Sequence, residues 1–182
     1  IVNTSGNNTI SGAVTLAAAS TINSNAGMLT FDVASGNGFA GNYNLTFDGA
    51  GNTTVADPIA TGTAGVIKNG SGILNMTGAN TYTGATTINA GTLIVERDSL
   101  TYTTSSYTGA GTLWVRSAAS SFASAYTFNA PISSLGGLTI GQTTNTTAVT
   151  LSSALSLSGN LLVYGPTSLA ANVTTGGTQE YT

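Results

Sequence analysis

The acidic residues offer the first candidates for chemistry, because the chain contains no histidine and no cysteine. Two of the acids end matching segments, Leu29-Thr30-Phe31-Asp32 and Leu45-Thr46-Phe47-Asp48. If these segments stack in parallel on adjacent layers, Asp32 and Asp48 could lie within the roughly 5 to 9.5 Å that separates a pair of glycosidase carboxylates. The sequence places no companion arginine, lysine or metal-ligand set beside them. This favours the simpler interpretation, in which each aspartate follows a strand and caps a turn.

The segment Glu96-Arg97-Asp98 is the only charged cluster in the chain. It follows a strand-like run and is expected to form a solvated corner or a small loop, with a recognition role as the alternative. No calcium-binding loop spacing is present, and the absence of histidine excludes Ser-His and zinc chemistry. The sequence therefore predicts no catalytic residue, no cofactor and no bound metal, and the chain is not expected to be an enzyme.

Aromatic residues are mildly concentrated in the middle of the chain. Trp114 alternates with Leu113 and Val115, so it should face outward if those two face inward. Exposed aromatics of this kind can stack on sugar rings, but they more often shield a sheet face or pack against a loop, which is the favoured interpretation. The five residues concerned are Tyr82, Tyr102, Tyr107, Trp114 and Tyr126.

Asparagine and threonine supply two further candidate surfaces. Asn-x-Ser/Thr sequons offer acceptors for glycosylation, although several would arise by chance in so Asn- and Thr-rich a chain. A flat row of threonines would suit an ice-binding face, but the spacing lacks a Thr-x-Thr in every layer. The sequons begin at Asn3, Asn7, Asn44, Asn52, Asn69, Asn75, Asn145 and Asn172.

The overall composition favours an extracellular protein. Only 5% of the 182 residues are charged, while 41% are hydrophobic, and the net charge is −3. Three basic residues cannot form the positive stripe that nucleic-acid binding needs, so no nucleic-acid partner is expected. No apolar run approaches the ~18 residues of a membrane-spanning helix, so no membrane insertion is expected either. The absence of cysteine rules out disulfide staples and is compatible with passage across a bacterial envelope.

A repeat of the form Gly-x-apolar-x-apolar predicts the strands that must position these residues. Successive copies begin mostly ~15 to 25 residues apart, within the range of a solenoid coil. The wide gap between Tyr43 and Gly72 predicts a loop excursion around residues 48–64. The copies begin at Gly12, Gly27, Gly72, Gly91, Gly111, Gly136 and Gly159, with a glycine-less relative at Tyr43.

Period-2 alternation within each copy predicts which side chains face inward. Because helical periodicity is absent, short strands with glycine corners predict an all-β, parallel β-solenoid of roughly eight or nine coils. Residues 1–182 are then one solenoid segment, expected to belong to a longer repetitive protein. An antiparallel β-sandwich is the alternative. The predicted inward pairs are Leu74 and Met76, Leu93 and Val95, Leu113 and Val115, Leu138 and Ile140, and Leu161 and Val163.

The stretch from Gly65 to Val95 closely resembles the passenger-associated repeat of bacterial autotransporters. That pattern runs Gly-x-Leu-x-Leu-x-Gly, then Asn-x-Tyr-x-Gly, then Thr-x-apolar-x-x-Gly-x-Leu. The segment from Ser133 to Gly165 is similar in style to the looser repeats of filamentous haemagglutinin. The positions that carry the first resemblance are Gly72, Leu74, Met76, Gly78, Asn80, Tyr82, Gly84, Thr86, Ile88, Gly91 and Leu93.

The resemblance implies a non-enzymatic, rigid stalk segment of a secreted bacterial surface adhesin. Two alternatives stay open: a subunit of an extracellular filament built by end-to-end stacking, and a polysaccharide-acting β-helix enzyme. The expected location is extracellular or on the bacterial cell surface. The expected partners are adjacent coils or head-to-tail copies, together with surface glycans or neighbouring cells. Coil stacking is expected to carry on past Thr182, since the last residues read as the start of another coil.

Overall fold

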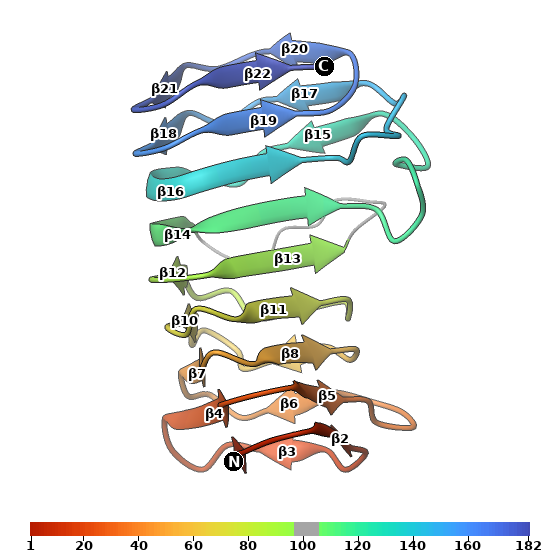
Figure 1. The fold of residues 1–182 in the computed structure, drawn as a ribbon, viewed down its shortest axis with the longest axis vertical. Helices are drawn as coiled ribbons and strands as arrows, with labels where there is room; N and C mark the ends of the chain where they lie inside the picture. The colour runs from red at the N-terminus through yellow and green to blue at the C-terminus, as the bar shows by residue number, and fades with distance from the viewer. Residues whose placement is uncertain (97–105) are drawn as a thin grey trace.

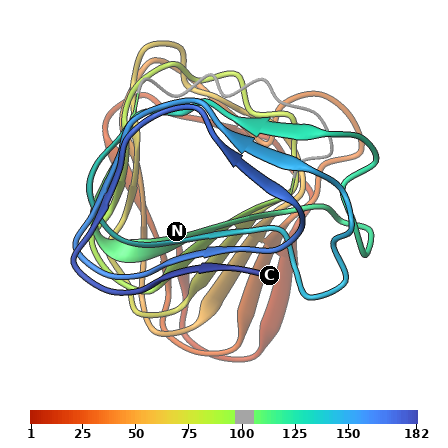
Figure 2. The same ribbon diagram turned by 90° about the horizontal axis from the view of Figure 1, so that it is seen from above.

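The chain forms a parallel β-solenoid of about eight turns, as the alternation predicted. The computed structural model describes residues 1–96 and 106–182, and these residues contain no helix. Every strand pair in this part of the chain is parallel, which excludes the antiparallel sandwich. Figure 1 shows the strands stacked along one axis with the two termini at opposite ends, and Figure 2 shows the coils superimposed around a common interior.

The strands lie on three faces, although not every coil has a strand on the third face. We number the coils from the N-terminus by their first-face strands, so that coil four begins at Val66, coil six at Tyr107 and coil nine at Val173. The first face contains β1 (Val2–Asn3), β4 (Ser20–Ser24), β7 (Leu45–Asp48), β10 (Val66–Lys68), β12 (Thr86–Ile88), β18 (Leu155–Leu157) and β21 (Val173–Thr175). The second contains β2 (Asn7–Ile10), β5 (Met28–Phe31), β8 (Asn52–Val55), β11 (Ile73–Met76), β13 (Thr92–Glu96), β19 (Leu161–Val163) and β22 (Gln179–Tyr181).

Two long strands, β14 (Tyr107–Arg116) and β16 (Ile132–Ile140), run around the corner and join the first and second faces into one sheet. The third face has two separate three-stranded sheets. One consists of β3 (Val14–Thr15), β6 (Phe39–Ala40) and β9 (Ile59–Ala60), and the other of β15 (Tyr126–Phe128), β17 (Val149–Leu151) and β20 (Thr167–Leu169).

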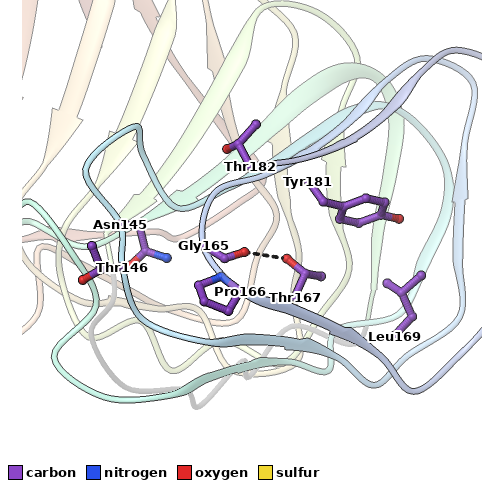
Figure 3. A pocket seen from close by; sticks show the side chains of 8 residues that line it. All are labelled: Asn145, Thr146, Gly165, Pro166, Thr167, Leu169, Tyr181 and Thr182. Atoms are coloured by element: carbon purple, nitrogen blue, oxygen red, sulfur yellow. Dashed lines mark hydrogen bonds between the residues drawn. The ribbon is translucent and has the colours of Figure 1, made fainter.

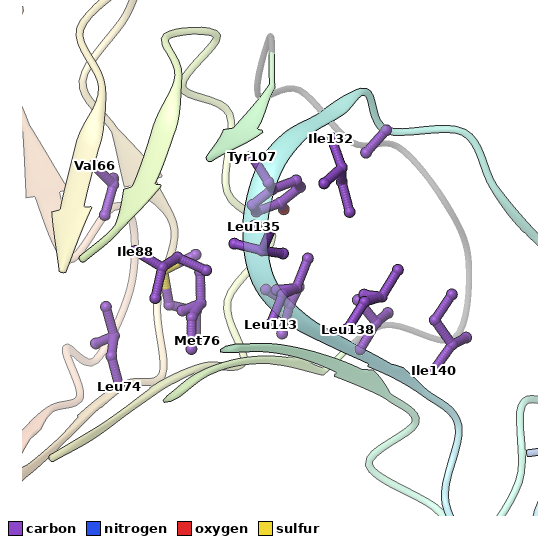
Figure 4. Close-up of a cluster of buried hydrophobic side chains, with 14 of the residues drawn as sticks. Val66, Leu74, Met76, Ile88, Tyr107, Leu113, Ile132, Leu135, Leu138 and Ile140 are labelled. Atoms are coloured by element: carbon purple, nitrogen blue, oxygen red, sulfur yellow. The ribbon is translucent and has the colours of Figure 1, made fainter. Parts of the chain in front are cut away.

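The core is one continuous column of apolar side chains that point toward the axis (Figure 4). On the second face, Leu74, Leu93 and Leu113 lie in register on successive coils. Leu138 and Leu161 continue this row. All ten predicted inward residues are buried, the most exposed being Val95 at 4%. The period-2 prediction is therefore confirmed, because each coil buries the same side of its strand against its neighbours.

Residues 48–64 differ from the prediction of a loop excursion. They contain β8 and β9, and Thr53 of β8 lies in register with Leu29 below and Leu74 above. The Gly-x-apolar-x-apolar pattern does not detect this coil because Thr53 occupies the inward position that leucine takes in the neighbouring coils. Thr53 is only 4% exposed. The longer connections lie elsewhere, at residues 117–125 and 141–148, where the chain passes from the second face to the third.

Candidate functional site

The corner between the first and second faces explains the repeated glycine. A methyl group on Gly72 would lie 2.0 Å from the carbonyl oxygen of Gly51, one coil below. One on Gly91 would lie 2.5 Å from the carbonyl oxygen of Gly72. Both contacts are far inside van der Waals distance, so only glycine lets the backbones stack this closely. We call this row the glycine ladder; it includes Gly27, Gly72, Gly91, Gly136 and Gly159.

Asparagine side chains tie successive coils together. The Oδ1 atom of Asn52 accepts a hydrogen bond from the backbone N–H of Ile73 at 2.9 Å, and Asn44 accepts one from Gly65 at 2.9 Å. The sequon residue Asn145 is 7% exposed, and its Nδ2 donates to the carbonyl oxygen of Tyr164 at 2.6 Å. Several of the sequon asparagines therefore have a structural role, and glycosylation stays a prediction.

Lys68 is an ionisable residue on the inward side of the repeat, and sequence reasoning did not single it out. Its side chain is only 3% exposed, between Phe47 and Ile88 in register. The ammonium donates to the carbonyl oxygen of Gly70 and, at 3.3 Å, to that of Ala90. Burial lowers the pKa of Lys68 from 10.5 to about 8, and the attraction of the Asp48 carboxylate opposes part of this fall.

The structure does not bring Asp32 and Asp48 together as a carboxylate pair. Asp48 ends β7 on the first face and lies in register with Asn23, whereas Asp32 follows β5 on the second face. The matching segments therefore lie on different faces of the solenoid and do not stack on each other. Asp48 accepts a hydrogen bond from the N–H of Gly49 at 2.7 Å, directly after β7. The turn-capping role of Asp32 and Asp48 stays a prediction.

Of the charged cluster, Glu96 lies within the described residues, whereas Arg97 and Asp98 lie outside them. Glu96 ends β13 and forms an ion pair with Arg116 on β14, with 2.6 Å between Oε1 and Nη2. The Arg116 guanidinium also lies 4.6 Å from the centre of the Trp114 ring. These three side chains form a fixed polar cluster on the outside of the second face.

The aromatic residues divide between the core and the surface. Tyr82, Tyr107 and Tyr126 are each 2% exposed, so they cannot form the exposed sugar-stacking surface that was one of the two interpretations. Trp114 does face outward and is half-buried, with its Nε1 donating to the carbonyl oxygen of Gly141 at 2.7 Å. Tyr102 lies outside the described residues.

The C-terminal end of the rod has a pocket of about 690 Å³ (Figure 3). Leu169 of β20 and Tyr181 of β22 line it and are 50% and 40% exposed. The Thr167 hydroxyl at its base donates to the carbonyl oxygen of Gly165 at 2.8 Å. In the middle of the rod, the residues at these positions are covered by the next coil.

No three acidic side chains in ranges 1–96 and 106–182 lie close enough to hold a metal ion together. The same ranges contain no helix that is long and apolar enough to cross a membrane.

Comparison with known proteins gives one family. The passenger-associated transport repeat matches residues 66–95, which cover β10 to β13 in coils four and five. Searches of curated proteins and of solved structures returned no match. The match implies secretion and surface exposure and suggests a structural passenger segment. The chain thus carries a passenger-associated transport repeat within a parallel β-solenoid, an arrangement typical of autotransporter passengers.

Proposed function

We propose that this chain is a non-enzymatic, rigid stalk segment of a secreted bacterial surface adhesin. The observation that carries the proposal is the stacking in coils four and five. There the matched repeat residues are the ladder glycines, Gly72 and Gly91, and the inward leucines, Leu74 and Leu93. These four residues stack one coil on the next through close backbone contact and apolar packing.

Such a stack suits export and mechanical support. Each coil contacts mainly its two neighbours, so the rod can form coil by coil as the chain emerges from a secretion pore. The low charge costs little because Thr, Ser and Asn provide solubility. The rod holds a length of ~40 Å for about eight turns, since neighbouring strands lie ~4.8 Å apart.

Two changes to the protein displayed on its bacterium test the stalk role. Removing residues 66–85, one whole coil, should leave both surface exposure and attachment to a target surface intact, because β12 can then stack on β7. Gly91→Val should abolish surface exposure, since the side chain blocks stacking. Loss of attachment after removal of the coil, with exposure retained, would show that this coil recognises the target and is not a spacer.

The absence of catalysis has a direct test. Incubation of the protein with pectin, alginate and glycosaminoglycans should release no reducing ends and no unsaturated products. Turnover that is lost in Asp32→Ala or Asp48→Ala would favour the polysaccharide-acting enzyme over the stalk.

A second candidate is a filament subunit, in which end-to-end stacking of separate copies continues the solenoid. Leu169 and Tyr181 offer apolar surface to a further coil, and stacked β-edges join readily. In this proposal the N-terminal coil of a second copy fills the pocket. Electron microscopy of concentrated protein should then show unbranched fibres, and Leu169→Lys should prevent them. Protein that stays monomeric at high concentration contradicts the filament.

A further inference from the structure

In a single coil, one outward position on the second face is occupied by glycine, which has no side chain. The first outward residue of each second-face strand forms a row along the rod. In this row only Gly137 of β16 is a glycine. The other members are Asn7, Met28, Asn52, Ile73, Thr92, Thr112, Asn160 and Thr178.

Coil stacking does not require this glycine. A methyl group on Gly137 would lie 3.4 Å from Oγ1 of Thr112 and 3.5 Å from the carbonyl oxygen of Asn160, which are ordinary contacts. The preceding residue, Gly136, belongs to the glycine ladder, and a methyl group there would lie 1.9 Å from the carbonyl oxygen of Ala110. A glycine inside a strand costs stability and often marks a place where a ligand approaches closely.

Gly137 lies in the wall of a groove of about 410 Å³ that extends across coils six to nine. Its walls carry hydroxyl, amide and carboxylate groups from Thr112, Thr139, Asn160 and Glu180, with Leu162 as an apolar contact. Asn160 uses Oδ1 to accept from the N–H of Thr178 at 3.0 Å. Among the described residues, its Nδ2 and the other three polar side chains make no hydrogen bond.

We propose that this groove binds a neutral linear oligosaccharide. Each of the four coils contributes one of these polar side chains, with Thr112 and Asn160 in the row of Gly137, and Thr139 and Glu180 two residues further along their strands. The hydroxyls of a linear sugar chain can both donate to and accept from such staggered groups. Trp114 lies on the neighbouring strand in register with Thr139 of the groove wall, and the bond from its Nε1 to Gly141 fixes the orientation of its ring. An aromatic side chain near well-placed polar groups is a common form of small-ligand site.

The negative charge of the groove wall favours neutral over anionic sugars. Glu180 is the only ionisable residue in the groove wall, and its carboxylate accepts hydrogen bonds from hydroxyls but repels anionic sugars. The nearest described cation of the face, Arg116, is held by Glu96 and Trp114. The backbone groups of β14, β16 and β19 beneath the groove are already paired on both sides, so an extended peptide lying in it could not add to the sheet there. This inference goes beyond the stalk role and does not depend on it.

Isothermal titration calorimetry of the intact chain tests the proposal with cellohexaose, mannohexaose and chitohexaose, and with hexagalacturonate as the anionic counterpart. At least one neutral hexamer should bind, and hexagalacturonate should not. Gly137→Thr refills the row and should weaken binding at least about tenfold. Thr54→Val, on the same face outside the groove, should leave the affinity unchanged.

The thermal unfolding midpoint of Gly137→Thr is measured alongside, and it should be equal to or above that of the parent chain. If Gly137→Thr loses binding and also unfolds at a lower temperature, Glu180→Gln is tested as well. This variant removes only the charge of the side chain and should weaken binding of the same hexamer. The proposal is overturned if no neutral hexamer binds. It is equally overturned if hexagalacturonate binds as tightly, or if neither variant changes the affinity.

Discussion

The strands of coils four and five turn the corner between the first and second faces differently from those of coils six and seven. In coils four and five the strands are short, the register is unbroken, and glycines turn the corner. In coils six and seven, β14 and β16 bend around that corner as single strands. Their register shifts beside Gly109, and Ser134 has a φ of 59°, which is rare for a residue other than glycine.

The surface features follow the same division. The regular coils carry the family repeat, and the exposed residues of their described part are uncharged: Asn69, Ser71, Ile73, Ala79, Thr81, Thr83, Ala85 and Asn89. The irregular coils carry the Arg116–Glu96 ion pair, Trp114, the groove at Gly137 and the long connections at 117–125 and 141–148. Stacking is therefore common to both regions, whereas the ion pair, the outward Trp114 and the groove lie where the strands depart from the regular coil.

The largest effect is expected from a charge placed in the regular core. Leu93→Asp puts an unpaired carboxylate at a position with no exposure, and it should reduce the free energy of unfolding by about 3 to 5 kcal/mol. Thr92→Asp, at the neighbouring outward position, should change it by less than about 1 kcal/mol. Urea denaturation followed by circular dichroism measures both. Equal losses would mean that the period-2 assignment of this strand is wrong.

The next largest effect separates two glycines, one from each region. Gly91→Ala should cost at least about 2 kcal/mol, because its φ is +65° and its new methyl group meets three carbonyl oxygens. Gly137→Ala should be neutral or stabilising by up to ~1 kcal/mol, because its methyl group makes only ordinary contacts. Thermal and urea unfolding of both variants sharpen the comparison. A large loss from Gly137→Ala would show that stacking needs both glycines.

A pH effect is expected from Lys68 in the regular coils. Because its pKa is about 8 in the fold and 10.5 when unperturbed, the unfolded chain binds more protons between these values. The free energy of unfolding should therefore rise with pH through this window, by about 1 to 3 kcal/mol when complete. Urea denaturation at pH 7.5 and 9.5 measures the rise. Lys68→Met, which keeps the buried stem, should remove it, and a rise that persists in this variant must come from another group.

The smallest effect concerns the ion pair beside the irregular coils. Glu96→Gln keeps the shape of the side chain but removes its charge, while the Arg116 and Glu96 side chains are 25% and 14% exposed. We expect a loss of about 0.5 to 1 kcal/mol, since partly exposed pairs contribute little. Trp114 fluorescence should shift as the guanidinium over its ring loses its anchor. An unchanged emission spectrum would show that Trp114 is held by its bond to Gly141 alone.

The sequence alone determined the parallel solenoid, its approximate number of coils, its ten inward apolar residues and the passenger-type repeat. These follow from local alternation and from a glycine that recurs with the coil, both of which can be read within a few neighbouring residues. Only the tertiary structure decided which segments share a face. That assignment depends on register between residues about 20 positions apart, and it separates Asp32 from Asp48 and places Thr53 in the core. It also distinguishes Gly136 from Gly137, because identical residues differ only in what the coil below presents to them.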